Sequence, residues 1–170
     1  MSFSLVPQYS FREFTDISPG FLRKLGIRFL MLDLDNTIAA YSEHSPAESV
    51  KQWIADIKKN GIEMYFISNS KRKYRVEVFA EAFDIGYIKD ARKPSPHCLA
   101  QAMETMGYSN GDSAFLGDQI FADTLAANRA GVISIVVRPI SLKNPLLSLR
   151  YVIEAPFRTA CIIKMRKEGL

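Results

Sequence analysis

Two aspartates, Asp33 and Asp35, stand one residue apart where an apolar run of the chain ends. The run before them, residues 27–32, is rich in β-forming side chains, which predicts a central parallel strand covered on both faces. A carboxylate at the end of such a strand gains no packing energy and costs several kcal/mol if it is buried without a partner. Asn36 and Thr37 follow the two aspartates directly, and this segment indicates a metal site that binds an anionic group. A helix N-cap and turn is the alternative.

The elements that must position these carboxylates alternate along the chain. After the first strand, we predict strands and helices in turn: helix 45–61, strand 62–67, helix 71–82, strand 85–88, helix 95–107, strand 114–116, a helix from Asp118 to Gly131, and strand 132–137. This alternation predicts an α/β fold, a doubly wound, Rossmann-like, five-stranded parallel sheet with right-handed crossovers.

Polar side chains follow the carboxyl ends of several predicted strands, which is where doubly wound sheets bind their ligands. Ser68 and Asn69 follow the second strand, Lys93 comes after the short third strand, and Asp118 ends the fourth. Because the carboxyl ends of parallel strands share one edge of the sheet, we expect these groups to converge with the two aspartates.

Carboxylates dominate the predicted site. The candidate metal ligands are Asp33, Asp35, Asp118 and Asp123. Up to four negative charges near one point require a cation. Hard oxygen ligands, with room left for water and a substrate phosphate, favour Mg²⁺ over transition metals.

Lys93 and Ser68 add the groups that a phosphate would need. A lysine just before a helix N-terminus can neutralise both the aspartates and a bound phosphate. Ser68, with Asn69, can donate hydrogen bonds to phosphate oxygens, and a cap to the following helix is its alternative role. A metal, a lysine, a hydroxyl and a carboxylate nucleophile together indicate phosphoryl transfer through an aspartyl-phosphate.

The same segments resemble, in order, the four motifs of the haloacid dehalogenase (HAD) superfamily of phosphatases. They are residues 33–37, Ser68, Lys93 and residues 117–123. Within this superfamily the chain is similar to the YqeG family and, next to it, to mitochondrial phosphatidylglycerophosphate phosphatases. That similarity is carried by residues 5–7, 16–19, 117–123 and 127–131.

The resemblance implies separate roles for the first two aspartates. Asp33 would attack phosphorus and bind Mg²⁺ through its other oxygen. Asp35 would protonate the leaving alkoxide and then activate water, with its backbone carbonyl on the metal. A carboxylate at position 35 also favours a phosphatase over a dehalogenase, because dehalogenases have no oxygen leaving group to protonate.

For the other motif residues the resemblance implies binding roles. Ser68 and Lys93 would hold the phosphoryl oxygens, and Asp118 would complete the metal site. Asp123 would support the metal shell or position Lys93.

The spacing of the motifs leaves no room for the cap domain that covers the active site in many members of this superfamily. Asp33 and Ser68 are 35 positions apart, and Ser68 and Lys93 are 25 apart. One loop and one helix fill the first interval, and a helix and a short strand fill the second. We therefore expect a HAD core without a cap, whose open site suits a substrate with bulk of its own, such as a protein, a nucleic acid or a lipid headgroup at a bilayer.

Composition predicts one domain, since 170 residues with 48% apolar side chains can bury a sizeable core. We place the HAD core at 1–140, with 1–26 as an extension packed on it, and a basic, partly apolar C-terminal segment at 141–170. The two cysteines match no metal spacing and indicate reduced thiols. With no secretory signal and no run of about 18 apolar residues, we expect a cytoplasmic protein without a transmembrane segment.

Positive charge is placed unevenly on the chain. Residues 138–170 hold seven basic groups against two acidic ones, and a basic run at 71–75 follows Ser68 directly. Apolar residues interleaved with basic ones predict a peripheral contact with an anionic membrane. Packing of the C-terminal segment on the core, and a solvated helix face for the basic run, are the alternatives.

Together these features predict a Mg²⁺-dependent phosphatase that acts on a phosphomonoester, with a bulky or membrane lipid such as phosphatidylglycerophosphate as the substrate. A phosphatase for a soluble nucleotide or sugar phosphate is one alternative, and a non-catalytic module that binds RNA or protein is another. Every catalytic position is intact, and only Tyr74 and Tyr151 stand among the basic residues, so we do not expect nucleic acid as a partner.

Overall fold

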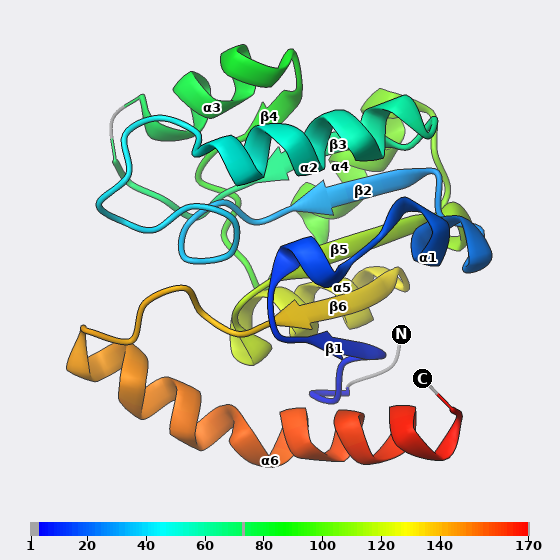
Figure 1. Cartoon of the computed structure of the whole chain (residues 1–170), viewed down its shortest axis with the longest axis vertical. Helices are drawn as coiled ribbons and strands as arrows, with labels where there is room; N and C mark the ends of the chain where they lie inside the picture. The colour runs from blue at the N-terminus through cyan, green and yellow to red at the C-terminus, as the bar shows by residue number, and fades with distance from the viewer. Residues whose placement is uncertain (1–3, 73, 170) are drawn as a thin grey trace.

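The computed structural model describes residues 4–72 and 74–169, so Lys73 of the basic run lies outside it. Within these ranges six parallel strands form one sheet in the order β1-β6-β5-β2-β3-β4 (Figure 1). The strands are β1 Tyr9–Phe11, β2 Phe29–Leu32, β3 Glu63–Ile67, β4 Gly86–Ile88, β5 Ser113–Gly117 and β6 Ile133–Val137. The parallel α/β class predicted from the sequence is confirmed.

Helices cover both faces of this sheet. They are α1 Pro19–Lys24, α2 Glu48–Lys59, α3 Arg75–Phe83, α4 His97–Met106, α5 Leu125–Ala130 and α6 Pro145–Lys167, with short helical turns η1 Phe14–Asp16, η2 Asn110–Asp112 and η3 Ile120–Thr124. Successive side chains of a strand point to opposite faces, so Leu30 and Leu32 of β2 pack with α1, α2 and α3, while Phe29 and Met31 pack with α4 and α5. Both faces are buried, which is why the strands consist of continuous apolar runs.

The prediction of five strands was wrong by one. The extra strand, β1, pairs in parallel with β6 at the edge of the sheet, with Tyr9 opposite Ile135. Its three residues are too few to show a strand period in the sequence. The pairing partner is supplied by β6, so only the tertiary fold identifies this segment as a strand.

Helix α3 begins at Arg75, later than the predicted start at residue 71. Tyr74 caps it with φ of 61°, a left-handed conformation that cannot continue a right-handed helix. Residues 68–72 therefore lie outside the helix, beside the carboxyl end of the sheet.

The strand register sets the predicted site residues at one level. Leu32, the last residue of β2, lies opposite both Phe66 of β3 and Leu116 of β5. The ladder extends one residue further, because the Asp33 amide donates to the Leu116 carbonyl at 2.8 Å. The residues after β2, β3 and β5 consequently meet at the same edge.

Helix α6 is a single helix of 23 residues that runs along the edge of the sheet beyond β1 (Figure 1). It contacts the edge strand directly, since the Ser10 amide donates to Met165 Sδ at 3.2 Å. The helix thereby covers backbone groups that an edge strand would otherwise expose. Among the described residues, no helix combines the length and the apolarity needed to cross a bilayer.

Candidate active site

Three buried carboxylates lie together at the carboxyl edge of the sheet. One oxygen from each of Asp33, Asp118 and Asp123 lies within 4.8 Å of the other two. Lys93 enters the same cluster, with its Nζ 2.5 Å from Asp33 Oδ1 and 2.8 Å from Asp123 Oδ1. The structure thus brings three of the four aspartates and the lysine predicted from the sequence to one point.

The loop after β2 fixes the orientation of Asp33. Thr37 Oγ1 donates to Asp33 Oδ2 at 2.8 Å. Asn36 turns the chain with φ of 67°, a conformation that asparagine tolerates better than most residues. Its side chain donates to the Ser141 carbonyl at 2.9 Å and accepts from the Ser141 amide at 2.8 Å, which ties the loop to the segment before α6.

Gly117 is what lets Asp123 reach the cluster. A Cβ at position 117 would lie 2.4 Å from Asp123 Cγ, closer than real carbon atoms approach. The Gln119 amide donates to Asp123 Oδ2 at 3.0 Å and holds the carboxylate in place. The glycine that ends β5 therefore has a packing reason that the sequence did not reveal.

The cluster carries more negative charge than the protein compensates. Burial, with a further contribution from Asp123, raises the pKa of Asp33 to about 7, although Lys93 and Thr37 act in the opposite direction. Burial, together with Asp123 and Asp33, raises the pKa of Asp118 well above its usual range. Burial opposes the charged form of Lys93, but Asp123 and Asp33 outweigh it and raise the pKa of the ammonium group.

A divalent cation fits this arrangement. Three buried carboxylates face one ammonium group, so their charges balance only if protons or a metal ion are taken up. The donors are all carboxylate oxygens, the ligand type that hard cations such as Mg²⁺ prefer. Asp33, Asp118 and Asp123 are the residues that could hold it.

The carboxylate of Asp35 is not part of this cluster and pairs with Arg75, a residue of the basic run for which a solvated helix face was the alternative to a place beside the site. The Arg75 side chain is only 4% exposed, and its Nε donates to Asp35 Oδ1. Its other nitrogens donate to the carbonyls of Ala40, at 2.7 Å, and Glu43. Arg75 thus holds both the Asp35 carboxylate and the loop beyond it. No sequence pattern distinguished this arginine from its basic neighbours.

Ser68 and Asn69 lie where β3 ends, beside Lys93. The buried Ser68 Oγ accepts a hydrogen bond from the Ser70 amide at 3.0 Å. Asn69 Nδ2 donates to the Lys93 carbonyl at 3.1 Å, and Asn69 Oδ1 accepts from the Lys93 amide at 3.0 Å. Asn69 therefore fixes the backbone from which the lysine side chain reaches the carboxylates.

An open cavity of about 420 Å³ lies over the cluster. Its lining consists of Asp33, Asp35, Tyr41, Asn69, Ser70, Lys71, Arg72, Lys93, Gln119, Ala122 and Asp123. A groove of about 780 Å³ shares Tyr41 and Arg72 with it and continues to Lys143 and Leu147 at the start of α6. Two residues of the basic run, Lys71 and Arg72, thus stand at the mouth of the site.

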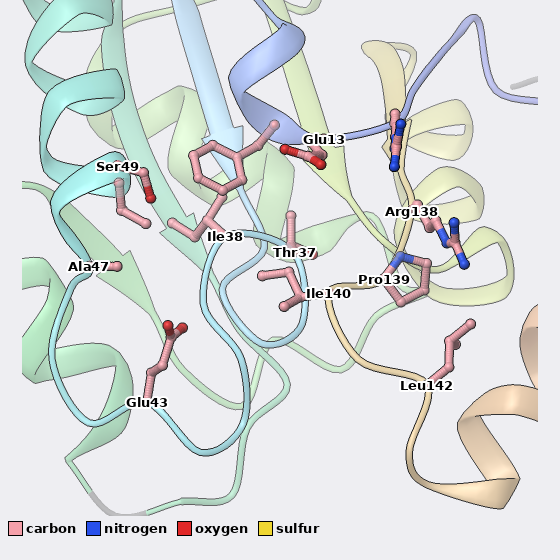
Figure 2. Close-up of a pocket in the computed structure, with 13 residues that line it drawn as sticks. Glu13, Thr37, Ile38, Glu43, Ala47, Ser49, Arg138, Pro139, Ile140 and Leu142 are labelled. Carbon is pink, nitrogen blue, oxygen red and sulfur yellow. The ribbon is translucent and has the colours of Figure 1, made fainter.

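A separate pocket of about 470 Å³ lies against the outer side of the loop that carries Thr37 and Ile38 (Figure 2). Pro139 and Ile140 close it from the segment before α6. It includes neither the carboxylate cluster nor Lys93. We therefore place the chemistry in the smaller cavity, where charged and polar groups converge.

Helix α6 fastens the loop that carries Asp118. Arg158 is buried and donates to the backbone carbonyls of Asp118 and, at 2.9 Å, Val137. Glu154, which accepts from Arg158 at 3.3 Å, also accepts from the Phe121 amide at 3.2 Å. Packing of the C-terminal segment on the core, which the sequence left open as the alternative to membrane contact, is made through this buried ion pair. The only sequence signal for it is the i,i+4 spacing of the two charges.

Comparison with known proteins agrees with this geometry. The sequence profile of the haloacid dehalogenase-like hydrolases matches residues 9–131. The chain belongs to this family. A relative in Bacillus subtilis (strain 168), named "Probable phosphatase YqeG", is 29% identical over 143 residues, which are 84% of this chain and 83% of that protein. The prediction of a HAD-type phosphatase is thereby confirmed.

Solved structures share the fold. An uncharacterised protein from Listeria monocytogenes serotype 4b superimposes with a TM-score of 0.56 at 16% identity, over 71% of this HAD chain and 80% of that chain. The cobalt-bound deoxy-D-mannose-octulosonate 8-phosphate phosphatase of Haemophilus influenzae gives a TM-score of 0.53 at 16% identity, over 67% of this chain and 70% of that one. At such identities the likeness concerns the fold alone.

Proposed function

We propose that this HAD phosphatase is Mg²⁺-dependent, works through an aspartyl-phosphate on Asp33, and acts on a bulky or membrane-bound phosphomonoester such as phosphatidylglycerophosphate. The observation that carries the proposal is the buried contact of Asp33 with Lys93 beneath an open cavity, with two further carboxylates beside it. A nucleophile, a cation for the phosphate and a metal-ligand set are then in one place.

In the first step an Asp33 oxygen attacks phosphorus and the bond from phosphorus to the ester oxygen breaks. Asp35 gives a proton to the leaving alkoxide. Thr37 supports this step by orienting Asp33 through its 2.8 Å hydrogen bond, and Arg75 supports it by holding the Asp35 carboxylate at the rim of the cavity. Such placement of a nucleophile and an acid is what lowers the barrier of group transfer.

In the second step Asp35 takes a proton from water, and the water oxygen attacks phosphorus. The bond between phosphorus and Asp33 breaks, which releases inorganic phosphate and restores the Asp33 carboxylate. Since Asp35 returns to its starting protonation state, one group serves as acid and then as base.

Other residues of the site would bind the phosphoryl group and the metal ion. Lys93 and Ser68 would bind the phosphoryl oxygens, with Asn69 at the same edge. Mg²⁺, held by Asp33, Asp118 and Asp123 with the Asp35 carbonyl, would supply positive charge against the phosphoryl oxygens. Lys93 Nζ contacts Asp33, Asp123 and the Ile67 carbonyl, so it would exchange one of these three hydrogen bonds for a phosphoryl oxygen while keeping its charge.

The choice of a bulky substrate rests on the open mouth and its charge. Among the described residues, the chain between β2 and β3 contains α2, and the chain between β3 and β4 contains α3, so neither interval holds a covering domain. Lys71 and Arg72 stand at the rim, where an anionic headgroup would approach. Because the sequence is similar to that of mitochondrial phosphatidylglycerophosphate phosphatases, phosphatidylglycerophosphate is the first lipid to test.

The test is phosphate release from phosphatidylglycerophosphate in vesicles, with Mg²⁺ and with EDTA, beside a panel of soluble nucleotide and sugar phosphates. We expect Mg²⁺-dependent release from the vesicles, far above the soluble panel, and none from an Asp33→Asn variant. Turnover of soluble esters alone would refute the lipid substrate. Undiminished turnover in EDTA would refute the metal requirement.

A further inference from the structure

Helix α6 presents several large apolar side chains to solvent, although it turns a charged pair toward the protein. The residues it buries are Glu154, Arg158 and Cys161. Its outer face, by contrast, carries five apolar side chains that are between half and three-quarters exposed: Leu146 74%, Leu149 58%, Val152 66%, Ile153 52% and Ile163 50%. We call these five residues the α6 outer face. A surface helix normally buries its apolar stripe, so a contiguous exposed stripe indicates a docking surface.

The surroundings of the α6 outer face are basic. The C-terminal end of the helix carries Lys164, Arg166 and Lys167 in its last turn. Near the other end stand Lys143 and Arg150, and the acidic residues of the helix region are the buried Glu154 and the terminal Glu168. An apolar stripe between cations complements a surface that is apolar inside and anionic outside.

The same helix begins at the mouth of the candidate active site. Leu147 and Lys143 line the groove that shares Tyr41 and Arg72 with the catalytic cavity. In Figure 1 the strand arrows point toward the side where α6 starts. Whatever covers the α6 outer face would therefore lie next to the entrance that a substrate uses.

The size of the stripe argues against a second copy of the chain. A helix of 23 residues is about 35 Å long and about 10 Å wide, so one face covers roughly 350 Å². Stable protein–protein interfaces bury about 800 Å² on each partner. A bilayer needs no such matching surface, because a helix that lies on it only has to sink its exposed apolar side chains to the level of the headgroups.

We propose that α6 docks the enzyme on an anionic lipid bilayer, with the α6 outer face at the boundary between headgroups and acyl chains. This inference rests on the proposed function only for the substrate that docking would present to the site. The helix lies along the surface in this arrangement, and its N-terminal end brings the catalytic groove to the level of the headgroups.

The test is binding of the full-length protein to vesicles of phosphatidylcholine with and without phosphatidylglycerol, measured by co-sedimentation. We expect strong binding only to the anionic vesicles. Ile163→Glu should weaken it more than tenfold, since it removes an apolar side chain that docking would bury in the bilayer and adds a charge of the wrong sign. Ile162→Glu is the matched control on the same helix, because this exposed residue lies about 100° around the helix from Ile163, and binding should stay within threefold.

Removing positive charge from α6 is a second, independent test of vesicle binding. Each lysine near an anionic leaflet strengthens binding about fivefold. Lys164→Gln combined with Lys167→Gln should therefore weaken binding about 25-fold and reduce its salt dependence. Equal binding to neutral and anionic vesicles, or no change in this double variant, would overturn the electrostatic part of the proposal and with it the choice of an anionic bilayer.

Activity separates this proposal from the function on which it rests. Ile163→Glu should leave hydrolysis of a small soluble phosphomonoester unchanged and lower only hydrolysis of the vesicle-bound lipid. A protein that hydrolyses soluble esters but does not bind vesicles would overturn docking and leave the phosphatase intact. A dimer in light scattering that Ile163→Glu dissociates would assign the α6 outer face to a second copy and overturn the proposal.

Discussion

The pairing of Arg75 with Asp35 leads to the sharpest mutational prediction. Arg75→Met keeps most of the length of the side chain and removes its charge. The substitution leaves the Asp35 carboxylate without its ion-pair partner, and it removes the Arg75 donors from the carbonyls of Ala40 and Glu43, of which Ala40 still accepts from the Glu43 amide. Both the free energy of unfolding and the turnover number should respond.

The expected size follows from burial. Removing one partner of a buried ion pair destabilises a protein by about 3–5 kcal/mol, because the other charge stays buried. The Asp35 side chain is 11% exposed and can regain some hydration, so we expect about 3 kcal/mol. Domains of this kind are stable by about 5–15 kcal/mol, so the variant should still fold. A misplaced acid/base group should lower kcat about 100-fold, at the small end of the usual contribution.

The assay combines urea unfolding with steady-state kinetics on a soluble phosphomonoester. KM should change little, since Arg75 holds Asp35 and does not line the cavity. The matched control is Arg28→Met, which breaks a surface ion pair of 2.6 Å with Asp112 at the opposite end of β2. The Arg28 side chain is 68% exposed, so this change should leave both the free energy of unfolding and kcat almost unaltered.

Arg75→Lys supplies a second check. A lysine can keep the charge near Asp35 but lacks the fork that reaches two carbonyls as well, so kcat should fall between the values of the wild type and of Arg75→Met. If Arg75→Met keeps its kcat within threefold and its stability within about 1 kcal/mol of the wild type, the ion pair does not position Asp35 and the reasoning is wrong.

Three further predictions concern the carboxylate cluster. Burial raises the pKa of Asp33 from 3.8 to about 7, so the metal-free folded protein binds a proton there more tightly than the unfolded chain does. The free energy of unfolding of the metal-free protein should therefore fall as the pH rises from about 4 through 7. Mg²⁺ requires the ionised carboxylate, so in calorimetry it should raise the melting temperature strongly at pH 8 and weakly at pH 5. Gly117→Ala would push against Asp123 and should abolish Mg²⁺-induced stabilisation, with a loss of about 1–3 kcal/mol measured by denaturant unfolding. Arg158→Met should lower the free energy of unfolding by about 3–5 kcal/mol, because it leaves Glu154 buried without its ion-pair partner. It should also weaken Mg²⁺ binding in titration calorimetry, because it releases the Asp118 carbonyl. Unchanged Mg²⁺ affinity would show that α6 does not support the loop that carries Asp118.

Much of the fold could be predicted because its signals are local. The apolar runs that became β2, β3 and β6 are bounded by helical segments, and this alternation allows few topologies. The strand β1 was missed because three residues have no measurable period, and the late start of α3 because the left-handed conformation of Tyr74 has no sequence marker.

The residues of the site likewise divide into those with a signal in the sequence and those without one. Residues that end strands, such as Asp33 and Lys93, were found because sheet topology brings strand ends together. Arg75 and Arg158 were missed, since a buried arginine is identified by its partners and not by its neighbours in sequence. Helix α6 packs on the core through Glu154 and Arg158, while the contact of its exposed apolar side chains with a membrane stays a proposal.

The most direct test of the proposed mechanism is to trap the aspartyl-phosphate on Asp33. The enzyme would be mixed with a phosphomonoester and Mg²⁺, quenched in acid within one turnover and reduced with borohydride, which converts an acyl-phosphate to an alcohol. We predict that mass spectrometry finds the reduced residue at Asp33 and nowhere else, and that the Asp33→Asn variant gives none. Turnover that proceeds with no modification at Asp33 would contradict the proposed mechanism.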